Sequence, residues 1–202
     1  MARDAYGNTP LMIASRDGDN VCITFLLEAH GDVDATNNKG MTALMFTSFK
    51  GHRASVSLLL QAHADPNLAD KKGGTALVQT SRWGHDNCLT LLITAHAKVN
   101  VITKKGNTAL ILATRHGHEN CVRLLLTAHA DVNIANKYEY SALIQASKFG
   151  YPNYLRLLLT ANANVHATTI IGNTALIEAS NRGHNECVAL LLKAHVMQML
   201  MQ

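Results

Sequence analysis

Apolar residues along the chain gather in short clusters with helical spacing, and turn-forming residues separate the clusters. Within positions 69–101, a cluster that begins at Leu77 predicts a first short helix, which Gly84 should end. A second cluster has apolar side chains at i, i+3, i+4 and i+7, which predicts a second helix; its members are Cys88, Leu91, Leu92 and Ala95. A unit of two such helices cannot bury its apolar faces alone, so we expect it to stack against similar units.

Polar residues at fixed places define the ends of these helices. Residues 70–73, Asp-Lys-Lys-Gly, predict a turn, because Asp can bond its own backbone and Gly supplies positive φ. Thr75 can cap the first helix through its hydroxyl. Gly84 suits the left-handed position after that helix. Asp86 lies in the first turn of the second helix, where the helix dipole favours an anion.

The same unit recurs every 33 residues through the chain. The capping residue is always followed by a small residue or Pro and then Leu, and the six caps are Thr9, Thr42, Thr75, Thr108, Ser141 and Thr174. A fixed period of this length predicts an all-α solenoid of stacked helix-turn-helix units. We therefore expect a single array over 1–196 and a short tail over 197–202. Its six repeats are approximately 3–35, 36–68, 69–101, 102–134, 135–167 and 168–196.

The motifs of the unit resemble those of the ankyrin repeat family. They are the Asp-x-x-Gly-x-Thr-x-Leu start, Gly-His between the helices (51–52, 84–85, 117–118, 183–184), Leu-Leu-Leu in the second helix (58–60, 124–126, 157–159, 190–192) and Asp-Val-Asn at 131–133. The resemblance covers residues 3 to 196. It implies an ankyrin-repeat solenoid with short β-turn or hairpin tips, which acts as a protein-binding scaffold. Fold alone does not fix the partner.

The chain departs from the family pattern at two positions. An apolar residue replaces the usual His after Leu, so we expect an apolar contact there; the residues are Met12, Met45, Val78, Ile111, Ile144 and Ile177. Where the family places Gly after the second helix, this chain has His30, His63, His96, His129, Asn162 and His195. We interpret these as residues tolerated in the left-handed region. A pH-sensitive histidine surface is an alternative. A metal column is disfavoured, since successive rungs should lie about 8–10 Å apart.

Composition and cysteine placement bear on the compartment. The chain is 48% hydrophobic, which is typical of a globular protein. No apolar run is long enough for a membrane span, and no signal segment is apparent at the start. The cysteines share one repeat position and are interpreted as small buried side chains; they are Cys22, Cys88, Cys121 and Cys187. Free thiols suit a reducing compartment, so we expect an intracellular, cytoplasmic location, with the nucleus as an alternative.

The family resemblance implies six variable positions per repeat that face a partner across the concave surface. These positions hold 13 of the 18 Lys and Arg residues but only one of the 14 acidic residues, Asp17. The only Trp and several Tyr and Phe residues lie there too, and Tyr, Trp and Arg are enriched at binding hot spots. The candidate partner-binding residues are Lys39, Phe49, Lys50, Lys71, Lys72, Arg82, Trp83, Lys104, Lys105, Arg115, His116, Lys137, Tyr138, Tyr140, Lys148, Phe149 and Arg182.

These residues favour binding of a protein or peptide with acidic character, without a cofactor or a metal. The second hypothesis is a single-stranded nucleic acid or another polyanionic, phosphate-bearing ligand, since a basic groove with aromatics also suits stacked bases. A merely solvated lysine surface is the simplest interpretation, but it explains the lysines better than it explains Trp83. Catalysis is disfavoured: His116 and His118 flank Gly117, yet no nucleophile-base set, HExxH motif or phosphate-cradling loop occurs.

The last repeat raises a separate expectation. Its second helix has no following repeat in this sequence, so we expect Cys187, Leu190 and Leu191 to lack cover. Solenoids need polar caps at their ends. Three alternatives remain open: more chain belongs after position 202, the apolar tail folds back as a lid, or the ends of two molecules associate.

Overall fold

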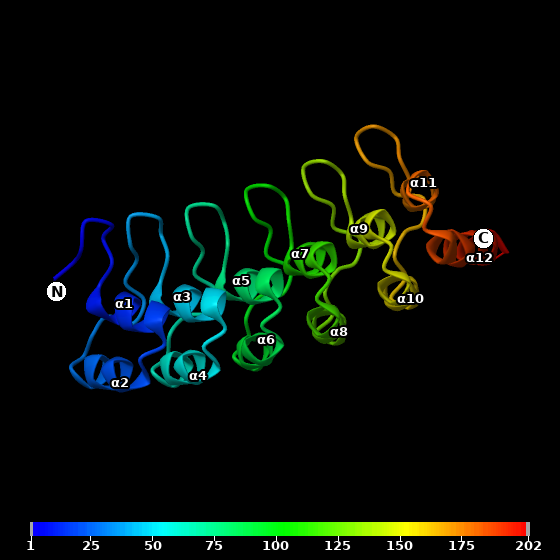
Figure 1. Cartoon of the computed structure of the whole chain (residues 1–202). Helices are drawn as coiled ribbons and strands as arrows, with labels where there is room; N and C mark the ends of the chain where they lie inside the picture. Colours follow the sequence, from blue (N-terminus) through cyan, green and yellow to red (C-terminus); the bar gives the residue numbers. More distant parts are fainter. Residues whose placement is uncertain (1, 201–202) are drawn as a thin grey trace.

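The chain forms a curved single row of stacked helix pairs in a computed structural model that describes residues 2–200, with side chains described up to residue 196 (Figure 1). An inner helix and an outer helix alternate along the row. The inner helices are α1 (Pro10–Asp17), α3 (Ala43–Lys50), α5 (Ala76–Trp83), α7 (Ala109–His116), α9 (Ala142–Phe149) and α11 (Ala175–Asn181). The outer helices are α2 (Asn20–Glu28), α4 (Arg53–Gln61), α6 (Asp86–Thr94), α8 (Glu119–Thr127), α10 (Pro152–Thr160) and α12 (Asn185–Leu200).

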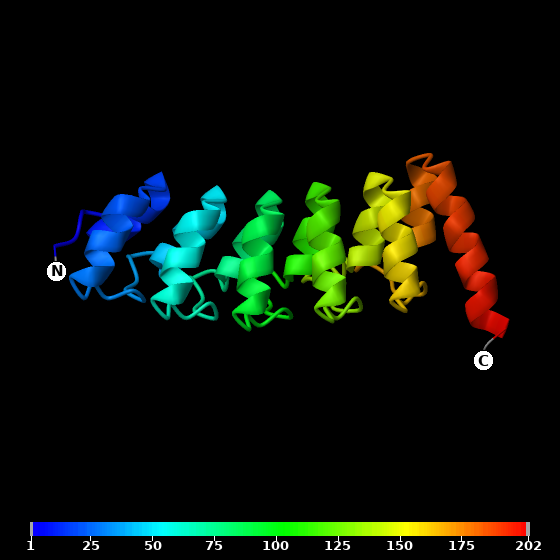
Figure 2. The ribbon, with the colours of Figure 1, turned by 90° about the horizontal axis from the view of Figure 1, so that it is seen from below.

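The loops between units project from one side of the row as hairpin-shaped tips (Figure 1). Each inner helix packs against the inner helices before and after it, and the outer helices do the same (Figure 2). The tips are built from turns. Between residues 2 and 200 the only β pairing consists of isolated bridges, Ala135 with Ser141 and Thr168 with Thr174. The predicted all-α solenoid with turn or hairpin tips is confirmed.

The predicted helix ends are also confirmed. The Thr75 hydroxyl accepts a hydrogen bond from the Val78 amide at 3.4 Å, and the other five caps make the equivalent bond. Gly84 ends α5 with φ of +76°. These bonds use amides that the first turn of a helix leaves without partners. The inner helices therefore begin at the same position of each repeat, and five of the six end before a left-handed glycine, whereas α11 ends one residue earlier, at Asn181.

Glycine-histidine pairs join neighbouring repeats. His85 Nε2 lies 3.1 Å from the Phe49 carbonyl of the preceding inner helix, and three other histidines of the motif make the same contact. The His85 ring occupies the space beside Gly51, where an added Cβ would come within 2.5 Å of His85 Nδ1. Gly51 also has φ of +77°. The motif is thus a packing contact between repeats, as its family role implies.

The residues after the outer helices follow the left-handed prediction in five repeats of six. His30, His63, His96, His129 and Asn162 have φ between 55° and 63°. The prediction is wrong for His195, which lies inside α12. In this repeat the outer helix continues through His195 to Leu200. Residues 197–200 continue the helix instead of folding back as a lid (Figure 2), and positions 201–202 lie outside the described residues.

The two end faces differ from the sequence-based expectation. Cys187 and Leu191 are buried, at 1% and 2% exposure, because their side of α12 faces the preceding repeat. Leu190 is half-buried. The exposed large apolar residues of the last repeat are instead Ile170, Ile171, Ile177, Leu192 and Val196. The apolar contact predicted at the usual His position forms in five repeats, and Ile177 is the exception. Cys22 is exposed, unlike the other cysteines, because no repeat covers its face of α2.

This difference in burial predicts selective thiol reactivity. Burial raises the pKa of Cys121 to about 12 and that of Cys88 to about 11, and it raises the pKa of Cys187 as well. Ellman's reagent should therefore modify one thiol of the native chain rapidly, at Cys22, and all four thiols only in denaturant. A hydrogen bond with Asp19 raises the pKa of Cys22, so its rate should increase as the pH rises. Rapid reaction of a Cys22→Ser variant would contradict this assignment.

Candidate partner-binding groove

A ladder of backbone hydrogen bonds places the lysines of successive tips side by side. The Lys71 amide donates to the Lys39 carbonyl at 2.9 Å, and the Lys104 amide donates to the Lys72 carbonyl at 2.8 Å. The Lys137 amide continues the ladder to the Lys105 carbonyl at 3.2 Å. Each tip is thereby fixed against its neighbour, and the lysines form a row along successive tips.

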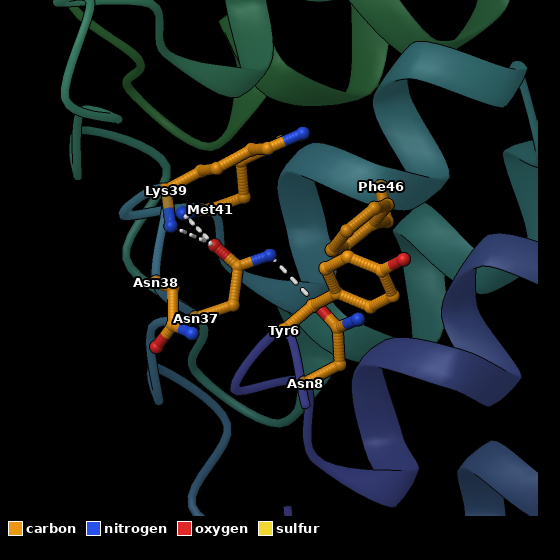
Figure 3. Close-up of a pocket in the computed structure, with 7 residues that line it drawn as sticks. All are labelled: Tyr6, Asn8, Asn37, Asn38, Lys39, Met41 and Phe46. Atoms are coloured by element: carbon orange, nitrogen blue, oxygen red, sulfur yellow. Dashed lines mark hydrogen bonds between the residues drawn. The ribbon is translucent and has the colours of Figure 1, made fainter. Parts of the chain in front are cut away.

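Side chains within each tip fix its shape. Asp70 Oδ1 accepts hydrogen bonds from the amides of Lys72 and Gly74, both at 2.8 Å. In the preceding tip, Asn37 Oδ1 accepts from the amides of Lys39 and Met41, both at 2.9 Å (Figure 3). The carboxylate of Asp70 therefore belongs to the scaffold of the tip, although its charge remains beside the lysines.

Three connected hollows lie between the tips and the inner helices of repeats one to four. The first, of about 250 Å³, is lined by Tyr6 and Phe46 among others and is drawn in Figure 3. It shares Lys39, Met41 and Phe46 with the second, of about 600 Å³. The second shares Lys72 and Arg82, among others, with the third, of about 400 Å³. We call this continuous depression the groove.

The floor of the groove includes a repeat position that the sequence analysis missed. Phe46 lines the first two hollows, Gln79 lines the second and third, and Leu112 lines the third. These residues are 33 positions apart, and the same position is filled in the other repeats by Ile13, Gln145 and Glu178. Variation at this position from apolar to amide to acid was the available signal. It was not among the six positions that the family resemblance implied.

Every candidate residue predicted from the sequence has an exposed or half-buried side chain. The structure brings eight of them together around the groove: Lys39, Phe49, Lys50, Lys71, Lys72, Arg82, Lys104 and Lys105. Trp83 adjoins this set through Phe49. The remaining candidates lie outside the three hollows, further along the same face or beyond it: Arg115, His116, Lys137, Tyr138, Tyr140, Lys148, Phe149 and Arg182.

An aromatic cluster with cations above it borders the groove at repeats two and three. The rings of Phe49 and Trp83 meet edge to face with centroids 5.2 Å apart. Lys50 Nζ lies 5.5 Å from the Phe49 centroid, and the Arg82 guanidinium lies 5.6 Å from that of Trp83. Trp83 nevertheless remains 48% exposed. A large aromatic surface next to fixed cations is therefore available to a partner.

Repeats five and six have an internal polar network. Lys148 Nζ donates to the Tyr140 hydroxyl at 3.2 Å and lies 4.4 Å from its ring centroid. The Tyr140 hydroxyl donates to Glu178, which also accepts from Asn173 and pairs with Arg182 at 3.5 Å. Glu178 is only 4% exposed. Lys148, Tyr140 and Arg182 were predicted as binding residues, but here they stabilise one another and Glu178.

Most cations of the groove, in contrast, lack an acidic partner. In the part of the chain with described side chains, the ion pairs are Arg16–Asp17, Arg123–Glu119, Arg156–Glu186 and Arg182–Glu178. None involves the candidate lysines or Arg82. Counting the variable positions nevertheless understated the acids of this side: Asp70 lines two of the hollows, and Glu139 occupies a tip position at which the other repeats have Gly.

His116 lies at the end of α7, next to the groove cations. Burial, followed by the charges of Arg115 and Arg82, lowers the pKa of its imidazole. It stacks with His118 at a centroid distance of 6.3 Å. His118 Nε2 lies 3.1 Å from the Arg82 carbonyl, so this imidazole takes part in the contact between repeats.

Two further searches concern metals and membranes. Where side chains are described, no group of three or more His, Cys, Asp or Glu residues has the arrangement that could hold a metal ion. Between residues 2 and 200, no helix has both the length and the apolar character required to cross a bilayer.

The helix pairs, their tips and the groove beneath the tips define a repeat solenoid. The chain belongs to the ankyrin repeat family: the family model for ankyrin repeats matches residues 1–70, 44–136, 77–169 and 128–199. Ankyrin repeats are protein-protein interaction scaffolds and are typically not enzymes.

Two solved structures illustrate the similarity. The crystal structure of EF0377, an ankyrin repeat protein, is 25% identical, with a TM-score of 0.83 over 91% of this chain and 96% of that one. The ankyrin repeat domain of Bcl-3, a member of the IκB protein family, is 29% identical, with a TM-score of 0.82 over 93% of this chain and 86% of that one. No curated protein sequence matches the chain.

Proposed function

We propose that this chain is a non-enzymatic scaffold whose concave groove binds an acidic segment of a partner protein. The observation that carries the proposal is the row of lysines on the tips, fixed by the backbone ladder and without acidic partners, above a groove whose floor is apolar at repeat two. Cations held in a row complement the carboxylates of an extended segment, and such complementarity also speeds association. The aromatic cluster at Phe49 and Trp83 supplies apolar contact area.

Single-stranded nucleic acid is the second candidate, because it also needs cations and aromatic faces. The proposal favours protein for two reasons. At the groove the exposed aromatics are Tyr6 in the first hollow and Trp83 of the Phe49–Trp83 pair, whereas Tyr138 and Phe149 lie outside the three hollows, so the aromatics do not provide a continuous series of stacking platforms. Their best-covered ring, Phe49, is also engaged edge to face with Trp83, which limits the stacking of a base on it.

A titration with two probes tests the proposal. We expect a fluorescein-labelled peptide rich in Glu, with one Trp, to bind the native chain more tightly than labelled oligo(dT) of equal charge, at both 50 and 200 mM salt. Binding of oligo(dT) should fall steeply with salt, because counterion release dominates its affinity. A glycine-serine peptide of the same length is the control. Tighter binding of oligo(dT) than of the peptide would instead support the nucleic-acid function, and no peptide binding at 50 mM salt would refute the proposal.

A further inference from the structure

The floor of the groove is not uniform along the row of repeats. At repeat two it is formed by Met41 and the half-buried Phe46, which line both the 250 Å³ and the 600 Å³ hollows. At repeat three the floor residue is the polar Gln79, and at repeat four it is Leu112, which is only 7% exposed. An apolar side chain of a ligand is therefore best accommodated at repeat two. The lysine pairs that could hold carboxylates lie beyond it, at repeats three and four.

Gly74 keeps the groove open between these two parts. Its repeat position is filled in the other repeats by Asn8, Met41, Asn107, Tyr140 and Asn173. A Cβ at Gly74 would lie 3.3 Å from Asp70 Oδ2 and Gln79 Nε2, the residues that line the second and third hollows. The absence of a side chain at Gly74 thus leaves room for a ligand to pass from repeat two to repeat four.

Tyr140 occupies the same repeat position in repeat five. Its ring is half-buried, and Lys148 and Glu178 fix its hydroxyl. None of the three hollows extends to it. From the apolar floor at repeat two to repeat four, the groove covers two repeat spacings, or about 20 Å if neighbouring helices lie about 10 Å apart. An extended peptide rises about 3.3 Å per residue, so this length corresponds to about six residues.

We propose that the groove recognises a short extended peptide with two unlike parts, an inference that rests on the proposed function. One aromatic or large aliphatic side chain of the peptide sits in the 600 Å³ hollow over Met41 and Phe46. Carboxylates about three to six residues away along the peptide pair with Lys72, Lys104 and Lys105. The specificity is therefore for an apolar anchor joined to an acidic run, and negative charge alone is insufficient.

Peptides that differ at one residue can test this specificity. The probes are fluorescein-labelled peptides with Trp, a Gly-Ser-Gly spacer and four Glu residues, made in both chain orders, together with matched peptides in which Ala replaces Trp. We expect Trp to increase affinity by about tenfold or more in at least one order, since burying a large apolar side chain contributes that much. Equal affinity of the Trp and Ala peptides in both orders would overturn the inference but leave the proposed function intact.

Two variants locate the anchor without altering any charge. Gly74→Tyr copies repeat five and should remove the gain from Trp while retaining the affinity of the Ala peptide. Phe46→Gln introduces the floor residue of repeat three and should also remove the gain in affinity from Trp. This variant tests the anchor site if Gly74→Tyr does not fold. Asn173→Tyr is the matched control, because it places the same side chain in repeat six, outside the open groove. A Trp gain that persists in a folded Phe46→Gln variant would overturn the anchor site.

Photo-crosslinking gives a direct position for the anchor. A peptide with benzoylphenylalanine in place of Trp should form adducts with Met41 or Phe46, identified by mass spectrometry. Adducts on repeat five or on the outer helices would overturn the inference. If none of the acidic peptides binds, both the proposed function and the inference fail. If the acidic peptides bind but Trp gives no increase in affinity, only the inference fails.

Discussion

Reversal of Lys71, Lys72, Lys104 and Lys105 to glutamate is expected to lower the affinity for an acidic Trp-containing peptide by about a hundredfold or more. Each replacement removes one exposed ion pair with the ligand and introduces a repulsion, and four such changes of modest size multiply to this factor. The folded chain should tolerate the variant, because these side chains are exposed and the backbone ladder between the tips does not involve them. Fluorescence anisotropy at low salt measures the loss.

The matched control separates a local effect from that of net charge. The basic residues outside the face include Arg53, Lys98, Arg123 and Lys193. Reversing these four changes the net charge by the same amount, from +4 to about −4, and should reduce affinity much less. The difference should diminish as salt screens the exposed charges. Equal losses in the two variants would show that the groove lysines act only through total charge, which contradicts a docked segment.

Local features of the fold were predictable from the sequence because short-range chemistry determines them. A threonine cap such as Thr75 bonds an amide three residues away, and Gly84 takes a conformation that other residues rarely adopt. Six copies of the same pattern then imply stacking, since each unit has apolar faces to bury. The left-handed residues His30, His63, His96 and His129 were predictable for the same reason.

The errors lie where a residue's environment depends on which side of a helix faces the neighbouring repeat. Cys22 and Cys187 share a repeat position that faces the preceding repeat, so the first is exposed and the second is buried. The sequence shows the shared position but not that direction. His195 differs from the histidines at the same position of the other repeats because it lies inside the longer helix α12.

The candidate groove was predicted in part. The period of 33 residues places the lysines and Trp83 at a few repeat positions, and the resemblance to ankyrin repeats implies that these positions share one face. The floor position at Phe46 and Gln79 was missed, because it becomes part of the groove only when the tip folds over the inner helix. The hydrogen bond between Tyr140 and Glu178 was also missed, since these residues are 38 positions apart and belong to neighbouring repeats, five and six.

The stacked architecture predicts that position along the row determines the cost of a core substitution. Leu110 is 1% exposed in α7, which packs against both α5 and α9. Leu110→Ala should lower the free energy of unfolding by about 3–4 kcal/mol, as expected for a fully buried leucine that leaves a cavity. Leu176 has the same repeat position in α11 but is half-buried and has a neighbour on one side only. Leu176→Ala should therefore cost about 1–2 kcal/mol.

The central substitution should also change how the chain unfolds. Stability of a repeat array is close to a sum of repeat terms and nearest-neighbour interfaces, so a weak repeat four uncouples the two halves. Urea unfolding followed by circular dichroism should show a single transition for the wild type and for Leu176→Ala, but a broader or biphasic transition for Leu110→Ala. Equal losses for the two leucines, with single transitions in both variants, would mean that the array unfolds as one unit, and that its ends are as well supported as its centre.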